Sequence, residues 1–307
     1  MASVALGDRR REAIVARPIA DRARLREFLE QDRLFAAYAI CDLEDREFGR
    51  TRWGAAWSGE ELIALVLEYG GLSPQPVFVL GDHEGIERIL ADVIRPRAAY
   101  VAALPLDLAA VATHYRVDLG PPMVRMWVDR ATFRPREGNV YRLEPGQIGE
   151  LNRLYGLGFA SWLPSSTLGD GVYFGIRVNG RLVAAAGTHV LSPNARLAVV
   201  GNVLTHIEHR GRGYATAVTS AVTEELLRTC DQVVLNVRSD NPPALAAYRH
   251  LGYQEHVRFE ERLIHRLGSP WPRFTALRRL LGRPNARMPS AATSRAPVGP
   301  AGPSDPH

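Results

Sequence analysis

Residues 138–268 alternate between two spacings of apolar side chains, one typical of strands and one typical of helices. Short β-branched runs predict strands at these positions: 140–143, Tyr173–Val178, 181–190, 197–204 and 232–237, with a last pair around 254–264. Apolar residues three and four positions apart predict helices that follow Pro145 and span 214–229 and 242–251. This order of elements indicates an α/β fold with a mixed sheet.

The first 120 residues show a similar alternation. Helices are predicted at 19–30, 33–43, 84–94 and 106–115, and strands at 51–57, Glu61–Tyr69, 76–80 and 99–102. Because this order repeats that of the second half, we expect two tandem lobes, with an unrelated α/β domain as the alternative for residues 1–120. Residues 121–137 contain three prolines and are predicted to be a linker. Residues 269–307, rich in Pro and Ala, are expected to form a basic, largely disordered tail.

The segment 209–215 carries the strongest chemical signal. It reads His-Arg-Gly-Arg-Gly-Tyr-Ala and joins the predicted strand 197–204 to the predicted helix 214–229. Free N–H groups at a helix N-terminus attract anions, and glycines let a ligand approach them. The segment lacks both the Gly-Lys-Ser/Thr ending of a Walker loop and the Gly-x-Gly-x-x-Gly order of the dinucleotide fingerprint. It therefore predicts a pyrophosphate-binding turn of another kind.

The run 210–215, of the form Arg-x-x-Gly-x-Ala, resembles the acyl-coenzyme A signature of the GNAT N-acetyltransferase superfamily. The segment 241–253 is similar to a second stretch of that family, Asn-x-x-Ala-x-x-x-Tyr-x-x-x-Gly-Phe/Tyr. The resemblance implies the GNAT acyl-coenzyme A acyltransferase fold, with residues 138–268 as the catalytic domain. Relatives such as mycothiol synthase and glycine N-acyltransferase pair an active lobe with a silent one, so we expect residues 1–120 to form a degenerate GNAT lobe.

The resemblance also implies roles for particular residues. The strand before the turn pairs with the pantetheine arm of acetyl-coenzyme A, which assigns Val203, Leu204 and Thr205. The turn holds the pyrophosphate, which assigns the residues Arg210, Gly211, Arg212, Gly213, Tyr214 and Ala215. Asn241 matches a position that contacts the pantetheine near the sulfur, and Tyr248 matches the general acid. A phenol is protonated at neutral pH and can donate to the departing sulfur. No metal is expected.

The residue that accepts the amine's proton is left open by the sequence. Many relatives carry a glutamate on the fourth strand, but no acidic residue lies between Asp170 and Glu208. His189 is the candidate base, because imidazole exchanges protons near neutral pH. His206, an ordered water or an amine that arrives neutral are the alternatives.

The turn of the first lobe that corresponds to the phosphate turn spans residues 81–85. It carries Asp82 and Glu84 and no arginine. Carboxylates at this place would repel a pyrophosphate, so we expect the first lobe not to bind coenzyme A.

The formal net charge of +5 belongs to the tail, because residues 268–307 hold six arginines and one aspartate. The neutral remainder argues against a nucleic-acid-binding surface. Cys41 and Cys230 provide neither a disulfide framework nor a metal-binding spacing, and we expect two buried thiols. The chain shows no signal-peptide pattern and no apolar run of about 18 residues. These observations predict a cytoplasmic protein without membrane association.

Taken together, these features predict an acetyl-coenzyme A-dependent N-acetyltransferase. The acceptor is a small-molecule or peptide amine, which attacks the thioester directly in a ternary complex. Phe159, Trp162 and Tyr173 lie in or beside the irregular stretch 158–170 that is expected to border the acceptor. A non-catalytic acyl-coenzyme A sensor is the alternative function. A homodimer is compatible with the sequence but is not required.

Overall fold

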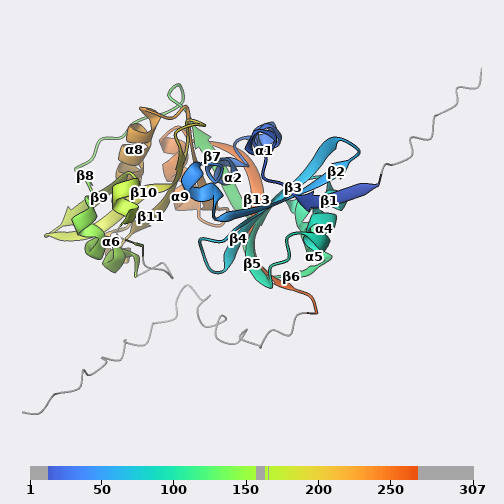
Figure 1. Cartoon of the computed structure of the whole chain (residues 1–307). Coiled ribbons are helices and arrows are strands. Elements are labelled where there is room, and N and C mark those ends of the chain that lie inside the picture. Colours follow the sequence, from blue (N-terminus) through green and yellow to red (C-terminus); the bar gives the residue numbers. More distant parts are fainter. Residues whose placement is uncertain (1–12, 157–162, 165, 269–307) are drawn as a thin grey trace, which may run out of the picture. The chain divides into compact units, whose positions relative to one another are not determined.

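The computed structural model describes residues 13–156, 163–164 and 166–268. Within these residues the strands form one sheet of thirteen, in the order β1-β2-β3-β4-β5-β13-β7-β12-β11-β10-β9-β8, with β6 beside β13 (Figure 1). The mixed α/β fold class is confirmed, and the two predicted lobes share this sheet. The predicted tail and the residues Phe159 and Trp162 lie outside the described residues.

The first lobe contains every strand that the sequence predicts for it. Its elements are β1 (Ile14–Pro18), α1 (Arg22–Leu29), the 3-10 helix η1 (Glu30–Asp32), α2 (Ala37–Cys41), α3 (Asp45–Phe48), β2 (Thr51–Ser58), β3 (Glu61–Tyr69), β4 (Gln75–Gly81), α4 (His83–Asp92), β5 (Ala98–Ala103), α5 (Pro105–Ala112) and β6 (Tyr115–Val117). The helix predicted over 33–43 is shorter than expected. The side chain of Asp32 accepts a hydrogen bond from the N–H of Phe35 at 3.1 Å, and this local turn delays the helix until Ala37.

The second lobe follows the predicted element order closely. Its elements are β8 (Tyr141–Arg142), η2 (Pro145–Gln147), α6 (Ile148–Tyr155), α7 (Ser166–Asp170), β9 (Tyr173–Val178), β10 (Arg181–Ser192), β11 (Leu197–Thr205), η3 (Ile207–His209), α8 (Tyr214–Leu227), β12 (Gln232–Arg238) and α9 (Pro242–His250). Asn179 and Gly180 both have positive φ, 49° and 76°, as a tight turn between β9 and β10 requires.

Strands β7 and β13 lie where the two lobes meet, and neither agrees with the prediction from the sequence. Strand β7 (Met123–Val128) falls inside the predicted linker 121–137, yet it pairs with β12 of the second lobe. Its apolar run is preceded by two prolines and interrupted by Arg125, which hid it. The expected strand pair around 254–264 is one strand, β13 (Gln254–Arg266). Its first half pairs with β7 and its second half with β5, so β13 joins the two lobes in one sheet.

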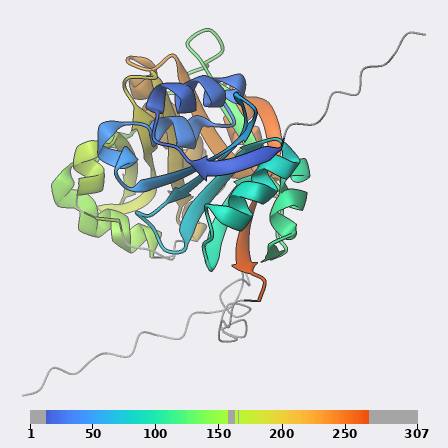
Figure 2. The same cartoon turned by 45° about the vertical axis from the view of Figure 1, so that its right-hand side comes forward.

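Helices α1 and α2 lie between the inward faces of the two lobes (blue in Figure 2). One apolar core contains Phe35 beside α2, Leu65 of β3, Val199 of β11, Val234 of β12 and Phe259 of β13. The opposite face of the first lobe packs against α4 and α5, and that of the second lobe against α8 and α9. The first lobe therefore covers part of the face of the second lobe that lies opposite α8, and α6 and α7 cover the part over β9 and β10.

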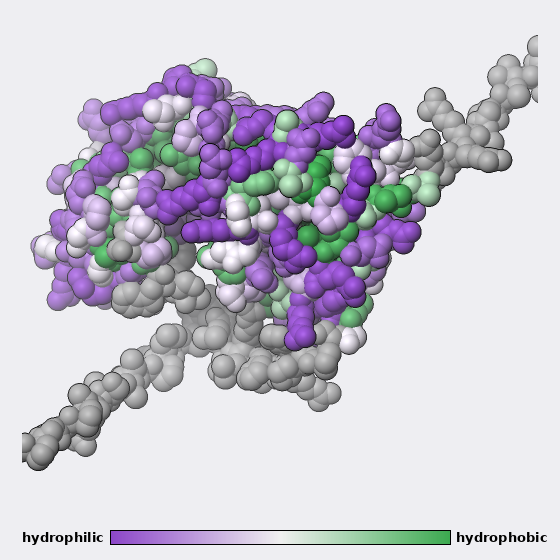
Figure 3. Space-filling model, viewed as in Figure 1, coloured by the Kyte–Doolittle hydropathy of each residue, from purple (hydrophilic) through white to green (hydrophobic). Residues whose placement is uncertain are grey.

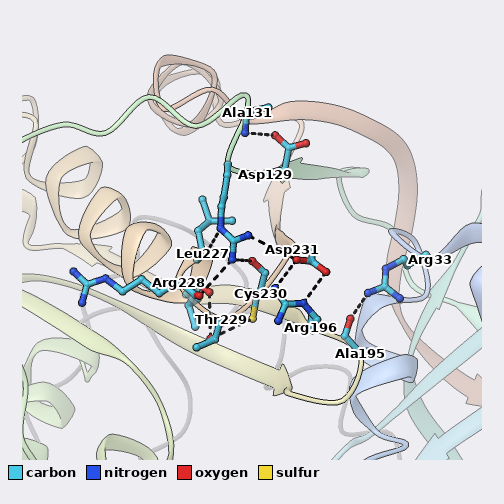
Figure 4. A network of polar contacts seen from close by, with 12 residues as sticks. Arg33, Asp129, Ala131, Ala195, Arg196, Leu227, Arg228, Thr229, Cys230 and Asp231 are labelled. Carbon is cyan, nitrogen blue, oxygen red and sulfur yellow. Dashed lines mark hydrogen bonds and ion pairs between the residues drawn. The ribbon is translucent and has the colours of Figure 1, made fainter.

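Near the first residues of β11 and β12, arginine side chains connect neighbouring segments by hydrogen bonds (Figure 4). Arg33 donates to the side chain of Gln232 at 2.9 Å and to the carbonyl of Ala195, so it joins the first lobe to β12 and to the turn before β11. Arg130 donates to the carbonyl of Leu227 at 2.6 Å, at the last turn of α8. A cation at a helix C-terminus is favourable both as a cap and toward the helix dipole.

On the face of the molecule drawn in Figure 3, hydrophilic side chains predominate and hydrophobic ones are scattered among them. None of the helices in the described ranges has the length and apolar character needed to cross a membrane.

Candidate active site

The turn between β11 and α8 leaves a helix N-terminus without a side-chain cap. Gly213 precedes the first residue of α8 with a φ of 76°, and no side chain accepts from the helix's first turn. Gly211 has the same φ of 76°, and a Cβ on either glycine would meet nothing within 4 Å. Glycine suits this left-handed conformation, and the free N–H groups face open space that an anion can enter.

The two arginines of this turn are exposed, as are Gly211 and Gly213. Arg210 donates from Nε to the carbonyl of Thr205, the last residue of β11, at 3.2 Å. This bond fixes the base of the Arg210 side chain against the strand. The six residues predicted for the pyrophosphate are thus contiguous at one helix N-terminus.

Strands β11 and β12 separate halfway along β11. Their parallel pairing runs from Leu197 to Val200 on β11 and ends at Val200 opposite Leu235. Strand β11 nevertheless continues to Thr205, still paired with β10. Val203, Leu204 and Thr205 are half-buried on this unpaired stretch. We call the point beyond Val200 and Leu235 the fork. Among the described residues, no strand pairs with the β12 side of β11 beyond this point.

A β-bulge at Asn202 produces this separation. Asn202 has a positive φ of 53°, and the β10–β11 register shifts between Gly201 and Leu204, the interval that contains it. Its side-chain amide donates to the hydroxyl of Tyr173 at 2.9 Å, and that hydroxyl donates to the carbonyl of Thr188 at 3.0 Å. The hydroxyl of Tyr155 donates to the carbonyl of Asn202. Tyr173, predicted to border the acceptor, therefore supports the bulge from inside the core.

Helix α9 carries the two residues predicted near the thioester sulfur. The side-chain oxygen of Asn241 caps the helix by accepting from the N–H of Ala244 at 3.3 Å. Tyr248 is only 7% exposed, and burial raises its pKa to about 12. Its ring lies 6.1 Å from that of Tyr253, whose hydroxyl is bonded to Thr223 at 2.7 Å. Tyr248 is therefore protonated at neutral pH, as a proton donor must be.

The structure separates the two histidines considered as bases. His189 of β10 lies at the fork, since a Cβ placed on Gly201 would meet its ring atoms at 3.1 Å. Its Nδ1 shares a hydrogen bond of 2.7 Å with the hydroxyl of Tyr38 from α2. His189 reaches solvent, yet the surrounding protein displaces enough water to lower its pKa below the ordinary 6.5. His206 instead accepts from the N–H of Glu208 at 3.3 Å, within the phosphate turn.

His206, Glu208 and His209 each place one potential ligand atom within 4.8 Å of the others. Such a set has the chemistry of a transition-metal site. The prediction that the protein uses no metal stays a prediction.

The sequence analysis missed four polar residues that lie together beside the fork. They are Tyr38 of α2, Arg125 of β7, Asn236 of β12 and Glu261 of β13. The guanidinium of Arg125 lies over the Tyr38 ring at 5.4 Å, and Asn236 donates to Glu261 at 2.9 Å. The strands around the phosphate turn carry no carboxylate, whereas Glu261 lies on β13, the last strand of the chain's described part. The sequence did contain a signal for these residues, because Asn236 and Glu261 interrupt apolar strands at positions that face inward.

Comparisons with known proteins concern the fold and the family of the chain. Residues 173–263 match the family described as FR47-like protein. No curated protein matches the chain. A Drosophila protein of known structure is 14% identical with a TM-score of 0.62, over 84% of this chain and 100% of its own. A GCN5-related N-acetyltransferase from Sphaerobacter thermophilus is 16% identical with a TM-score of 0.53, over 82% and 94%.

A tandem GNAT protein from the clavulanic acid biosynthesis pathway is 16% identical with a TM-score of 0.51, over 84% of this chain and 99% of its own. Because that match spans both lobes, the likeness extends to the tandem arrangement of the fold. The FR47-like match covers the strands and helices that build the fork and the phosphate turn. The chain thus has a tandem GNAT fold, and residues 173–263 of its second lobe resemble the FR47-like family.

Proposed function

We propose that the protein is an N-acetyltransferase that moves an acetyl group from acetyl-coenzyme A to an amine. One observation carries the proposal: the uncapped N-terminus of α8 stands directly after a strand, β11, that has lost its partner on one side. An acyl-coenzyme A molecule needs both features. Its pyrophosphate needs free N–H groups, and its pantetheine amides need an unpaired strand edge.

In this proposal the residues predicted from the sequence divide between these two features. Residues 210–215 bind the pyrophosphate, with Arg210 and Arg212 supplying charge. Val203, Leu204 and Thr205 offer their backbone groups to the pantetheine. Asn241 uses its side-chain oxygen as a helix cap, so its amide N–H groups remain to contact the arm near the sulfur.

The chemistry is a direct transfer in a ternary complex. The amine nitrogen attacks the thioester carbonyl carbon, the carbon–sulfur bond breaks, and an amide forms. Tyr248 donates its proton to the departing sulfur. His189 accepts the proton that the nitrogen loses, with His206 or water as alternatives. Cys41 and Cys230 are buried, and burial raises the pKa of both thiols, which disfavours a covalent intermediate on cysteine.

The test is to incubate the purified chain with acetyl-coenzyme A and a panel of amines and amino acids, reading the release of free thiol. Acetyl-coenzyme A should stabilise the protein against heat, and at least one amine should accelerate thiol release. Stabilisation without thiol release for any amine would indicate the sensor alternative. Absence of both would overturn the proposal.

A further inference from the structure

The fork has one polar group on each of its two strands. Val199 of β11 and Val234 of β12 face the core that contains α1 and α2. Side chains on a strand alternate between its faces, so Gly201 and Asn236, two positions further on, share that face. His189 lies over Gly201 on the β11 side. Asn236 stands on the β12 side, directly after Leu235, the last residue paired with β11.

Asn236 is bonded to a carboxylate that comes from the far end of β13. Its amide nitrogen donates to Oε1 of Glu261 at 2.9 Å. This orientation of the amide follows from charge, because a carboxylate accepts hydrogen bonds and cannot donate them. The amide oxygen of Asn236 is buried and has no hydrogen-bond partner among the described residues. A buried acceptor left unpaired costs free energy, so its geometry indicates a missing donor.

The charge of Glu261 is compensated only in part, by Arg125, by the hydrogen bond from Asn236 and by Arg262. Burial raises its pKa, and the largest opposing effect is the positive charge of Arg125. One terminal nitrogen of Arg125, however, donates to the carbonyls of Leu34 and Phe35, at 3.1 and 3.0 Å. In the described part of the chain, Glu261 takes part in no ion pair. A half-buried carboxylate beside an unpaired amide oxygen fits a cation that brings several N–H donors.

We propose that Asn236 and Glu261 bind the acceptor of the reaction as an ammonium ion at the fork. An ammonium group supplies positive charge to Glu261 and an N–H donor to the amide oxygen of Asn236. A hydroxyl group of the same size has a single donor and no charge. The inference rests on the proposed acetyl transfer, and it narrows the acceptor to a primary amine that arrives protonated.

The remaining steps balance within this arrangement. His189, on the β11 side of the fork, accepts one proton from the bound ammonium. His189 releases that proton to solvent, and the neutral nitrogen attacks the thioester carbonyl carbon. As the carbon–sulfur bond breaks, Tyr248 protonates the sulfur that leaves and His189 accepts the second proton of the nitrogen. A proton from solvent then restores the Tyr248 phenol, and His189 returns its proton to solvent. Tyr38 holds His189 through the hydrogen bond of 2.7 Å, so a residue of the first lobe orients the proton acceptor of the second. Glu261 itself keeps its charge and positions the substrate.

The experiment measures ammonium binding separately from acetyl transfer. The full chain is saturated with coenzyme A, which has no acetyl group to transfer, and titrated with n-butylammonium or butan-1-ol while NMR shifts are followed. Wild-type protein should bind butylammonium at least about tenfold more tightly than the alcohol. Glu261→Gln should abolish this preference, and Asn236→Ala should reduce it. Glu255→Gln is the matched control, since Glu255 is on the same strand but pairs with Arg249 at the surface.

Equal binding of the amine and the alcohol by wild-type protein would overturn the inference. Retention of the preference in Glu261→Gln would overturn it as well. Should Glu261→Gln not fold, Asn236→Ala decides alone by the same criterion. The acetyl-transfer assay distinguishes the two proposals. If Glu261→Gln releases thiol with an unchanged KM for the amine, only the proposed ammonium site is contradicted. If the wild-type protein binds ammonium but releases no thiol, only the proposed transferase activity is contradicted.

Discussion

Each lobe has a helix that begins directly after a strand, but the N-terminus of this helix is capped by a side chain in the first lobe and uncapped in the second. In the first lobe, α4 follows β4, and the side chain of Asp82 caps the helix by accepting from the N–H of Gly85 at 3.0 Å. In the second lobe, α8 follows β11, and Gly213 stands at the capping position with no side chain at all. A helix N-terminus binds an external anion only where the protein has not already supplied one of its own.

The strands that precede these helices also differ between the lobes, in how deeply the residues beyond the last strand pair are buried. Pairing between β4 and β5 ends at Phe78 opposite Ala102, but the next residues, Val79 and Leu80, are buried. Beyond the last pair of β11, all residues from Gly201 to Thr205 are half-buried. Phe28 of α1 packs against Gly81 at the end of β4. The fork of the first lobe is thus occupied by the protein's own apolar side chains.

The helices that follow complete the contrast. Both α5 and α9 have proline in their first turn, and both continue through Leu-Ala-Ala, at residues 108–110 and 245–247. The next residue is Val111 in the first lobe and Tyr248 in the second. Leu104 precedes α5 where Asn241 precedes α9. The two lobes thus differ in the helix cap, in the fork, and at the positions of Asn241 and Tyr248. These differences support a structural role for the first lobe and the proposed chemistry in the second.

The largest expected effect comes from making the second lobe resemble the first. Gly213→Asp places a carboxylate at the capping position of α8, as Asp82 does for α4. We expect the thermal stabilisation by acetyl-coenzyme A to disappear, because the new carboxylate occupies the N–H groups and repels the pyrophosphate. Gly180→Asp is the matched control, since Gly180 has the same φ of 76° and equally open surroundings. A normal shift in Gly213→Asp would show that this turn does not bind the cofactor.

Removing the phenol tests the contrast with Val111. Tyr248→Phe should lower kcat by about 10²–10⁴-fold while coenzyme A affinity changes little, because the hydroxyl acts when charge develops on sulfur. Tyr253→Phe removes a neighbouring buried hydroxyl that bonds to Thr223, and kcat should stay near the wild-type value. Near-wild-type turnover in Tyr248→Phe would assign this residue to packing.

A pH profile tests whether the first lobe contributes to the chemistry of the second. Only neutral imidazole accepts a proton, and the pKa of His189 is lowered, so kcat/KM should decline as pH falls through a value below 6.5. His189→Gln should abolish this limb and reduce the rate by about 10²-fold. Tyr38→Phe removes one hydrogen bond and should cost about fivefold. An acidic limb that persists in His189→Gln would move the base elsewhere.

The smallest expected effect concerns α4, the capped helix of the first lobe. Asp82→Ala should cost about 1 kcal/mol of unfolding free energy, because α4 loses its cap. Calorimetric titration with acetyl-coenzyme A should still give one site per chain, since Val79 and Leu80 keep the first fork filled. A second site in this variant would show that Asp82 alone silences the first lobe.

The local chemistry and most of the helices and strands could be predicted from the sequence alone. Strand Tyr173–Val178, the Asn179–Gly180 turn and the glycine turn before α8 follow from residues that are close in the chain. Spacing also indicated that Asn241 precedes a helix and that Tyr248 lies on it. These features depend on backbone preference and on periodicity, which neighbouring residues decide.

How the two lobes share one sheet, and how residues of both come to lie beside the fork, depends on contacts between distant parts of the chain. Strand β7 was hidden because Arg125 lies in its middle, and that charge is tolerated only where the carbonyls of Leu34 and Phe35 accept from it. Tyr38 and Glu261 are more than 220 positions apart in the chain, and no local pattern relates them. Their place beside the fork follows from β13 crossing into the first lobe and from α2 packing on β11, because a sheet brings distant segments together through backbone pairing that any sequence can form.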